Sequence, residues 1–166
     1  NAAGSATAAR SRYQAGLGAA SSFNSANPGF LAIYGMEWGV ISNGGHLNIF
    51  NSSELFSWEY NSSNELFGDR YVAKSDYAAL YGAMRAQGLI GQFNHPETSG
   101  QFAINGTDLA YSADGDEVMV LAEVLNTSAF SSNTTETETG RSSYEDAFNK
   151  LLERGYHVAP ATNQDN

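Results

Sequence analysis

Cysteine is absent from the 166 residues of this chain. Its absence excludes disulfides, thiolate metal sites and a cysteine nucleophile. A metal ion would therefore have to be bound by histidine, aspartate and glutamate side chains. Such ligands suit Zn, Mn, Fe or Mg better than the softer metals.

Basic residues are scarce as well. Lysine and arginine together number 8 against 18 aspartates and glutamates, which gives a formal net charge of -10. This balance argues against nucleic acid as a partner, because binding to phosphate backbones comes mainly from lysine and arginine. An acidic surface favours cations, but it is equally typical of proteins from salty or extracellular settings. With few lysines and many Asn, Ser and Thr residues, the composition predicts a periplasmic or extracellular location in a bacterium.

Long apolar runs are missing too, since no stretch approaches the roughly 20 apolar residues that span a bilayer. Hydrophobic residues make up 42% of the chain and aromatic residues 12%, which is a globular composition. The length predicts a single domain covering residues 1–166. The chain starts at Asn1 without a methionine and stops at Asn166, so we expect the natural protein to continue at both ends.

Three helices are predicted from capping residues and apolar spacing. Residues 1–29 form a helix and loop lead-in, of which the alanine-rich part 6–20 is the helix. A second helix starts at the N-cap Ser75, and a third starts at Ser143, which lies at capping-box spacing from Asp146. The apolar stripe of the second helix consists of Tyr77, Leu80, Tyr81 and Met84.

Five short apolar runs are predicted to be buried strands. They cover residues 30–34, 47–50, 89–93, 118–124 and 156–159. The alternation of helices and strands after residue 75 indicates a parallel α/β sheet. The polar and aromatic segment 51–74 is predicted to be a long surface excursion, and 97–116 a loop. His157 lies inside the last run and is predicted to be structural or exposed.

Chemically active side chains follow these runs. Glu37 comes after the first run, and a glycine-rich turn then leads to His46. His95 comes soon after the third run, Glu123 lies near the end of the fourth, and Asp165 follows the last. Because the carboxyl ends of parallel strands meet at one edge of a sheet, we expect these side chains to share one polar pocket. Two histidines with two or three carboxylates can bind one or two divalent ions, although a single histidine is more often a hydrogen-bonded structural residue.

Five sequence motifs occur in an order that resembles a known superfamily. They are GMEWG and GGHLN, then FNHP, LAEVLN and LLERGYHVAPATNQDN, within residues 30–166. In this order they resemble the PHP (polymerase and histidinol phosphatase) metallohydrolases, and most closely the bacterial carbaryl-hydrolase-like branch. The resemblance implies an α/β fold, a distorted (β/α)7 TIM-like barrel with metal ions at the carboxyl ends of its strands.

The resemblance also implies roles for individual residues. The implied metal ligands are Glu37, His46, His95 and Asp165. Of these, Glu37 and His95 would be the catalytic residues at the reacting centre, while Glu123 and Asn126 would support the site. The complete family site holds two or three Zn, Mn or Fe ions.

Two parts of the family pattern are missing. The opening H-x-H and T-D-H motifs do not occur here, and the histidine that closes the D-x-H motif would be residue 167. We therefore expect an incomplete barrel that lacks its first strands and its last ligand and leaves sheet edges exposed. Such a ligand set would not hold the full metal cluster of the family.

The leading functional prediction is a metal-dependent hydrolase, most of all a phosphoesterase, that uses metal-activated water. Carboxylic or carbamate esters are the alternative substrates on the same site. The expected partner is a small-molecule ester, with no nucleic acid and no membrane span, and oligomers or larger assemblies stay open.

A different class of function is a non-catalytic extracellular module with a structural, assembly or glycosylated binding role. It rests on five Asn-x-Ser/Thr sequons, although an Asn- and Ser-rich chain contains such triplets by chance. The sequons start at Asn51, Asn61, Asn105, Asn126 and Asn133. Bound metal with turnover would favour the hydrolase, and glycan mass or a metal-free polymer would favour this alternative.

Overall fold

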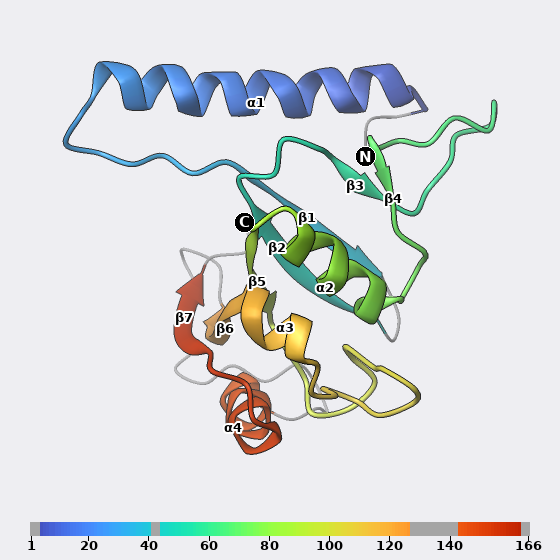
Figure 1. The fold of residues 1–166 in the computed structure, drawn as a ribbon, viewed down its shortest axis with the longest axis vertical. Coiled ribbons are helices and arrows are strands. Elements are labelled where there is room, and N and C mark those ends of the chain that lie inside the picture. Colours follow the sequence, from blue (N-terminus) through green and yellow to red (C-terminus); the bar gives the residue numbers. More distant parts are fainter. Residues whose placement is uncertain (1–3, 41–43, 127–142, 164–166) are drawn as a thin grey trace.

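A five-stranded mixed sheet forms the centre of the molecule (Figure 1). The structure is a computed structural model that describes residues 4–40, 44–126 and 143–163. The strands lie in the order β1-β2-β5-β6-β7 across the sheet. Their bounds are β1 Gly35–Val40, β2 Gly45–Phe50, β5 Ile90–Asn94, β6 Met119–Asn126 and β7 Ala159–Asn163.

The directions of the strands rule out the predicted barrel. β2 runs antiparallel to both β1 and β5, whereas β5, β6 and β7 run parallel to one another. Within the described residues the sheet is open, with β1 and β7 at its two edges. The distorted (β/α)7 barrel is therefore wrong. One physical reason is that residues 41–44 alone join β1 to β2, which is enough for a hairpin but too short for the crossover that parallel strands need.

β1 begins later in the chain than predicted. The run 30–34 is not a strand, and three of its apolar side chains are exposed: Phe30, Leu31 and Ile33. Pairing with β2 begins at Gly35, which lies opposite Phe50. Glu37 consequently lies within a strand rather than beyond its end.

The other strand predictions fare better. Residues 47–50, 89–93 and 118–124 fall in β2, β5 and β6 with shifts of one or two residues at their ends. The predicted strand 156–159 meets β7 only at Ala159, because Tyr156 packs in the hydrophobic core before the strand starts.

All three predicted helices are confirmed. α1 spans Ala6–Ala26, longer than expected, and α2 spans Tyr77–Ala86 with Asp76 rather than Ser75 as its N-cap. α4 spans Tyr144–Arg154 and carries the predicted capping box of Ser143 and Asp146. No helix among the described residues is both long enough and apolar enough to cross a membrane.

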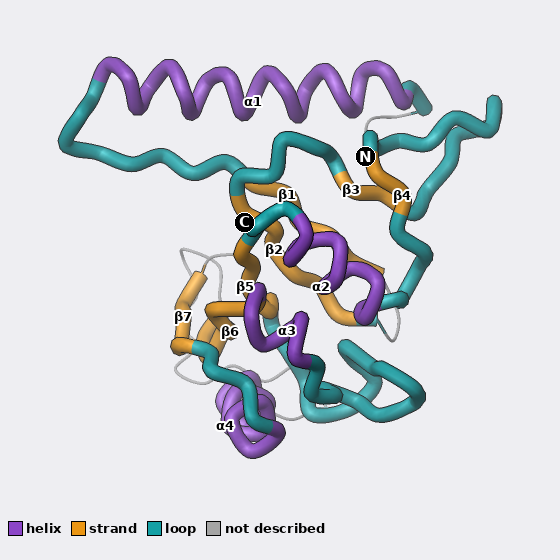
Figure 2. Tube along the Cα trace, viewed as in Figure 1, coloured by secondary structure: helices purple, strands orange, loops and turns teal. Residues whose placement is uncertain are grey.

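A fourth helix was not predicted. α3 spans Ala113–Val118, and Ser112 caps its N-terminus. It begins inside the segment 97–116 that was expected to be loop and ends at the first residue of the predicted strand 118–124. The chain between β5 and α3 is otherwise a long loop (Figure 2). Because α3 has only six residues, ADGDEV, and few of them are apolar, its sequence shows no helical periodicity.

The two faces of the sheet differ in character. One face packs against α2, whose predicted stripe is buried in a single core with side chains from the strands. The core side chains of β1, β2 and β5 are Met36, Trp38, Leu47, Ile49 and Phe93. Because successive side chains in a strand point to opposite faces, the polar residues between them face the other side.

The segment 51–74 leaves the five-stranded sheet, as predicted, but Phe56 and Val72 return to the hydrophobic core. Its two short strands, β3 Phe56–Ser57 and β4 Arg70–Tyr71, pair with each other in parallel, and α1 lies beside them (Figure 1). Tyr13 of α1 donates to the backbone oxygen of Ser52 at 2.8 Å. Trp58 donates its indole N–H to the backbone oxygen of Gly39 at 3.1 Å. These contacts hold the excursion between α1 and the edge strand β1.

Candidate metal centre

Two rows of residues cross the sheet on the face opposite α2. Glu37, Asn48 and Gln92 lie opposite one another in β1, β2 and β5, and Gly39, His46 and Asn94 form the neighbouring row. Facing side chains in adjacent strands start about 4.5–5.5 Å apart at Cβ. Polar groups in the two rows can therefore reach one another directly.

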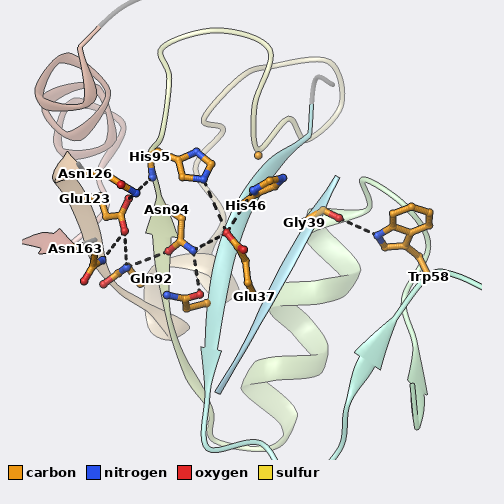
Figure 3. Close-up of polar contacts among 12 residues, drawn as sticks. Glu37, Gly39, His46, Trp58, Gln92, Asn94, His95, Glu123, Asn126 and Asn163 are labelled. Atoms are coloured by element: carbon orange, nitrogen blue, oxygen red, sulfur yellow. Dashed lines mark hydrogen bonds and ion pairs between the residues drawn. The ribbon is translucent and has the colours of Figure 1, made fainter. Parts of the chain in front are cut away.

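Three side chains of types that can bind metals converge at these rows: Glu37 and His46 belong to them, and His95 directly follows Asn94 (Figure 3). Nδ1 of His46 lies 3.4 Å from Oε1 of Glu37, and Nε2 of His95 lies 3.9 Å from the same oxygen. The two imidazole rings meet edge to face with centroids 5.0 Å apart. One ligand atom from each residue lies within 4.8 Å of the other two, so the group could hold a metal ion.

The spacing of these atoms is close to that of a real metal site. Bonds of about 2.0–2.1 Å in tetrahedral geometry place ligand atoms roughly 3.4 Å apart. The oxygen of Glu37 and the nitrogen of His46 already have this separation. The nitrogen of His95, 3.9 Å from the same oxygen, lies somewhat farther away than this spacing.

Gly39 makes room for the imidazole of His46. A Cβ atom at position 39 would lie 2.2 Å from Cδ2 of that ring, far inside van der Waals contact. The hydroxyl of Tyr77, on α2, donates to the backbone oxygen of Gly45 at 2.9 Å and so anchors the residue before His46. The pairing of β1 with β2 and the contact with α2 thus fix the position of the His46 imidazole.

His95 directly follows β5 and has an unusual backbone. Its φ angle is 31°, in the left-handed region that costs a residue with a side chain on the order of 1–3 kcal/mol. Its backbone N–H donates to Oε2 of Glu123 at 2.6 Å. Its ring lies 6.4 Å from the ring of Tyr144 on α4, measured between centroids. Hydrogen bonding and packing therefore hold this conformation in place.

Glu37 is held as an ionised carboxylate. A hydrogen bond from His46 lowers the pKa of Glu37 most, a bond from Asn94 and the charges of both imidazoles act in the same direction, and partial burial opposes them. Asn94 donates to Oε1 of Glu37 at 3.1 Å and also to Oδ1 of Asn48 at 3.0 Å. The side chain of Glu37 is 44% exposed, against 15% for His95. Solvent therefore reaches the site from the side of Glu37.

Glu123 is buried behind His95, with 2% of its surface exposed. Its carboxylate accepts hydrogen bonds from the backbone N–H of His95 and from the side-chain amides of Gln92, Asn126 and Asn163. The donors come from β5, from the residue after it, from β6 and from β7. This network ties the ends of three parallel strands to the histidine.

The predicted site residues are thus mostly brought together. Glu37, His46 and His95 form the cluster, and Glu123 and Asn126 support it from behind, while Asp165 lies outside the described residues. The cluster forms for a different reason than expected, because Glu37 and His46 meet through hairpin register and not at parallel strand ends.

Two further sequence predictions are settled by geometry. His157 is exposed, with Nδ1 3.0 Å from Oδ2 of Asp116, and it belongs to that pair rather than to the cluster. Asn126 is buried and its amide donates to Glu123 at 2.7 Å, so this first residue of a sequon makes an interior contact. The sequon at Asn133 lies outside the described residues.

Four network residues were missed by sequence reasoning: Asn48, Gln92, Asn94 and Asn163. Residues 89–93 were interpreted as a buried strand, without a distinction between its two faces. Polar residues at positions 92 and 94, with Gly91 and Phe93 alternating between them, are instead typical of a strand with one polar face. This alternation was the signal that could have identified Gln92 and Asn94.

Comparisons of the chain with protein-family models, curated proteins and solved structures found no match. The resemblance to PHP metallohydrolases therefore stays a prediction. The function has to be argued from the geometry of the site.

Proposed function

We propose that the chain is a metal-dependent hydrolase in which Glu37, His46 and His95 bind a divalent ion. The observation that carries the proposal is the convergence of one carboxylate and two imidazoles on a single point at a solvent-accessible face. Two histidines with one glutamate are a ligand set of catalytic zinc sites, which keep a further position for water or substrate. Zn is the first candidate ion, followed by Mn and Fe.

The bound ion would lower the pKa of a coordinated water and polarise the bond to be cleaved. The residues of the chain have separate tasks. Glu37 supplies negative charge at neutral pH, and the hydrogen bonds from His46 and Asn94 keep its pKa below the ordinary value. Asn94 orients the carboxylate by donating to Oε1, and Gly39 leaves the space in which His46 reaches that oxygen.

Phosphoesters are the substrates we propose first, and carboxylic or carbamate esters second. The ion-pair partners of Glu37 are the two histidines of the site. Lysine and arginine together number only 8 in the chain, so the ion would have to supply most of the positive charge that stabilises a phosphoryl group in the transition state. A carboxylic ester needs less of this positive charge in its transition state. The two substrate classes therefore differ in how much positive charge the site has to supply.

The test is hydrolysis of 4-nitrophenyl phosphate, bis(4-nitrophenyl) phosphate and 4-nitrophenyl acetate after loading with Zn²⁺ or Mn²⁺. We expect metal-dependent turnover that falls by roughly a hundredfold or more in Glu37→Gln and His95→Ala. The matched control is His157→Ala, which removes the third histidine of the chain at an exposed position away from the cluster. This control should keep turnover within about twofold of the original, because surface changes away from a site have small effects.

Each outcome separates the candidate functions. Turnover of the two phosphoesters alone supports a phosphoesterase, and turnover of the acetate alone moves the proposal to carboxylic esters. Turnover that is equal in all variants contradicts a role for the cluster. Binding of metal without turnover of any ester would favour the non-catalytic binding or structural role.

A further inference from the structure

The burial of the Glu123 carboxylate costs free energy. Glu123 is almost fully buried, and the four groups that donate to it are neutral amides and a backbone N–H. A buried charge has to be compensated by hydrogen bonds, and replacement of buried ions by uncharged groups is often neutral or stabilising. The stability of the sheet alone therefore does not require a carboxylate here.

One carboxylate oxygen controls the backbone of His95. Oε2 accepts the N–H of His95 at 2.6 Å, a short bond of the charge-assisted kind. His95 has the left-handed φ of 31°. A strong acceptor at this point offsets the cost of the unusual conformation, and that conformation sets the direction in which the imidazole leaves the strand.

The other oxygen is connected to Glu37 through two amides. Gln92 donates to Oε1 of Glu123 at 3.3 Å and to Oδ1 of Asn94 at 3.0 Å. Because Oδ1 of Asn94 accepts from Gln92, the NH₂ group of Asn94 is turned toward Oε1 of Glu37, to which it donates at 3.1 Å. Gln92 and Asn94 thus connect the buried carboxylate to Glu37, as the dashed lines in Figure 3 show.

We propose that Glu123 is a positioning residue that places two of the three metal-binding groups, His95 through its backbone N–H and Glu37 through Gln92 and Asn94. Glu123 does not bind the ion itself. This inference rests on the metal site of the proposed function. It extends that site from three ligands to a network across β1, β5, β6 and β7.

The decisive variant is Glu123→Gln, which keeps the size of the side chain. In Glu123 one oxygen accepts from Gln92 and Asn163, and the other accepts from His95 and Asn126. Glutamine replaces one of these oxygens by an NH₂ group, which cannot accept, so either the bond from His95 or the bond from Gln92 is lost. We expect the affinity for Zn²⁺, measured by calorimetry, to fall by about tenfold to a hundredfold, as is usual for residues that orient metal ligands. We also expect the visible spectrum of bound Co²⁺ to change, because the ligand geometry changes.

The control for lost stability is Val118→Ala, which removes buried methyl groups at the end of α3 and no hydrogen bond of the network. It should lower the melting temperature but leave the Zn²⁺ affinity and the Co²⁺ spectrum unchanged. If Glu123→Gln does not fold, Asn163→Ala replaces it. That variant removes a single donor to Glu123 and should weaken Zn²⁺ binding by roughly threefold to tenfold.

A readout without metal distinguishes failure of this inference from failure of the proposed function. The rings of His46 and His95 are close enough for nuclear Overhauser effects between their protons. These should be present in the metal-free protein and in Val118→Ala, and lost in Glu123→Gln. Loss of these effects in a protein that binds no metal would remove the proposed function but keep the positioning role. Unchanged effects in the folded variant, or an unchanged Zn²⁺ affinity, would overturn the inference.

Discussion

Gly39 lies directly opposite His46 in the ladder between β1 and β2, and the imidazole occupies the space that a side chain at position 39 would fill. A glycine in the middle of an edge strand weakens the strand, so this position has a cost in stability. In return the imidazole occupies the space beside Gly39 and reaches the carboxylate of Glu37, which lies two residues before Gly39 in β1. The glycine is therefore part of the site.

The first prediction is that Gly39→Ala moves His46 and weakens metal binding. The new methyl group would overlap the ring, which is 28% exposed and can turn toward solvent. We expect the dissociation constant for Zn²⁺, measured by calorimetry, to rise by about tenfold or more. The variant should remain folded, because the displaced imidazole can turn into solvent.

The matched control is Gly18→Ala, at a helical position in α1 where no atom would lie near the added Cβ. This change should raise the free energy of unfolding by roughly 0.5–1 kcal/mol through better helix propensity and leave Zn²⁺ binding unchanged. Equal Zn²⁺ affinity in the two glycine variants would contradict the role assigned to Gly39.

The second prediction concerns the hydrogen bond by which Tyr77 of α2 holds Gly45 at the start of β2. Tyr77→Phe removes the hydroxyl that donates to the backbone oxygen of Gly45 and leaves a buried acceptor without that bond. The free energy of unfolding in urea should fall by about 1–2 kcal/mol. Tyr71→Phe, at an exposed tyrosine, should change it by less than roughly 0.5 kcal/mol. Similar values for both variants would show that the bond to Gly45 contributes no more than a surface hydroxyl.

The third prediction concerns the acid dependence of stability. Burial alone would raise the pKa of Asp116, but hydrogen bonds from the backbone N–H and imidazole of His157, with a weaker one from Tyr111, lower it below the ordinary 3.8. The unfolded chain therefore takes up this proton first as the pH falls. The contribution of Asp116 to stability is full above its unfolded pKa and is lost as the pH falls through the folded value.

The measurement is urea unfolding of the original chain and of Asp116→Asn from neutral pH to about pH 2.5. The curve of stability against pH should be shallower in the variant below about pH 4, the ordinary range for aspartate. Parallel curves throughout this range would contradict the stabilising contact between Asp116 and His157.

The residues of the site could be predicted from the sequence more accurately than the fold that holds them. Glu37, His46 and His95 were selected because each follows an apolar run. His95 does follow β5, but Glu37 lies inside β1 and meets His46 through antiparallel pairing. The interpretation of the strands as a parallel barrel failed because it took 30–34 as the first strand and left the hairpin out.

Long-range pairing explains what the sequence could not supply. The position of Glu123 behind His95 depends on the pairing of β6 with β5, and the contact of Asn163 depends on the pairing of β7 with β6. Local patterns do not contain these registers. The cap of α4 was easier to predict, because capping depends on residues three apart in the chain, and the cap of α2 was predicted one residue too early.

The most direct test of the account is the metal content of the purified chain after incubation with Zn²⁺ and removal of the excess, measured by elemental mass spectrometry. The account predicts about one bound ion per chain in the original and in His157→Ala, because one carboxylate and two imidazoles make one site. It predicts loss of most of that ion in Glu37→Gln and in His95→Ala. Absence of metal from the original chain, or equal metal in all four proteins, would contradict the metal centre.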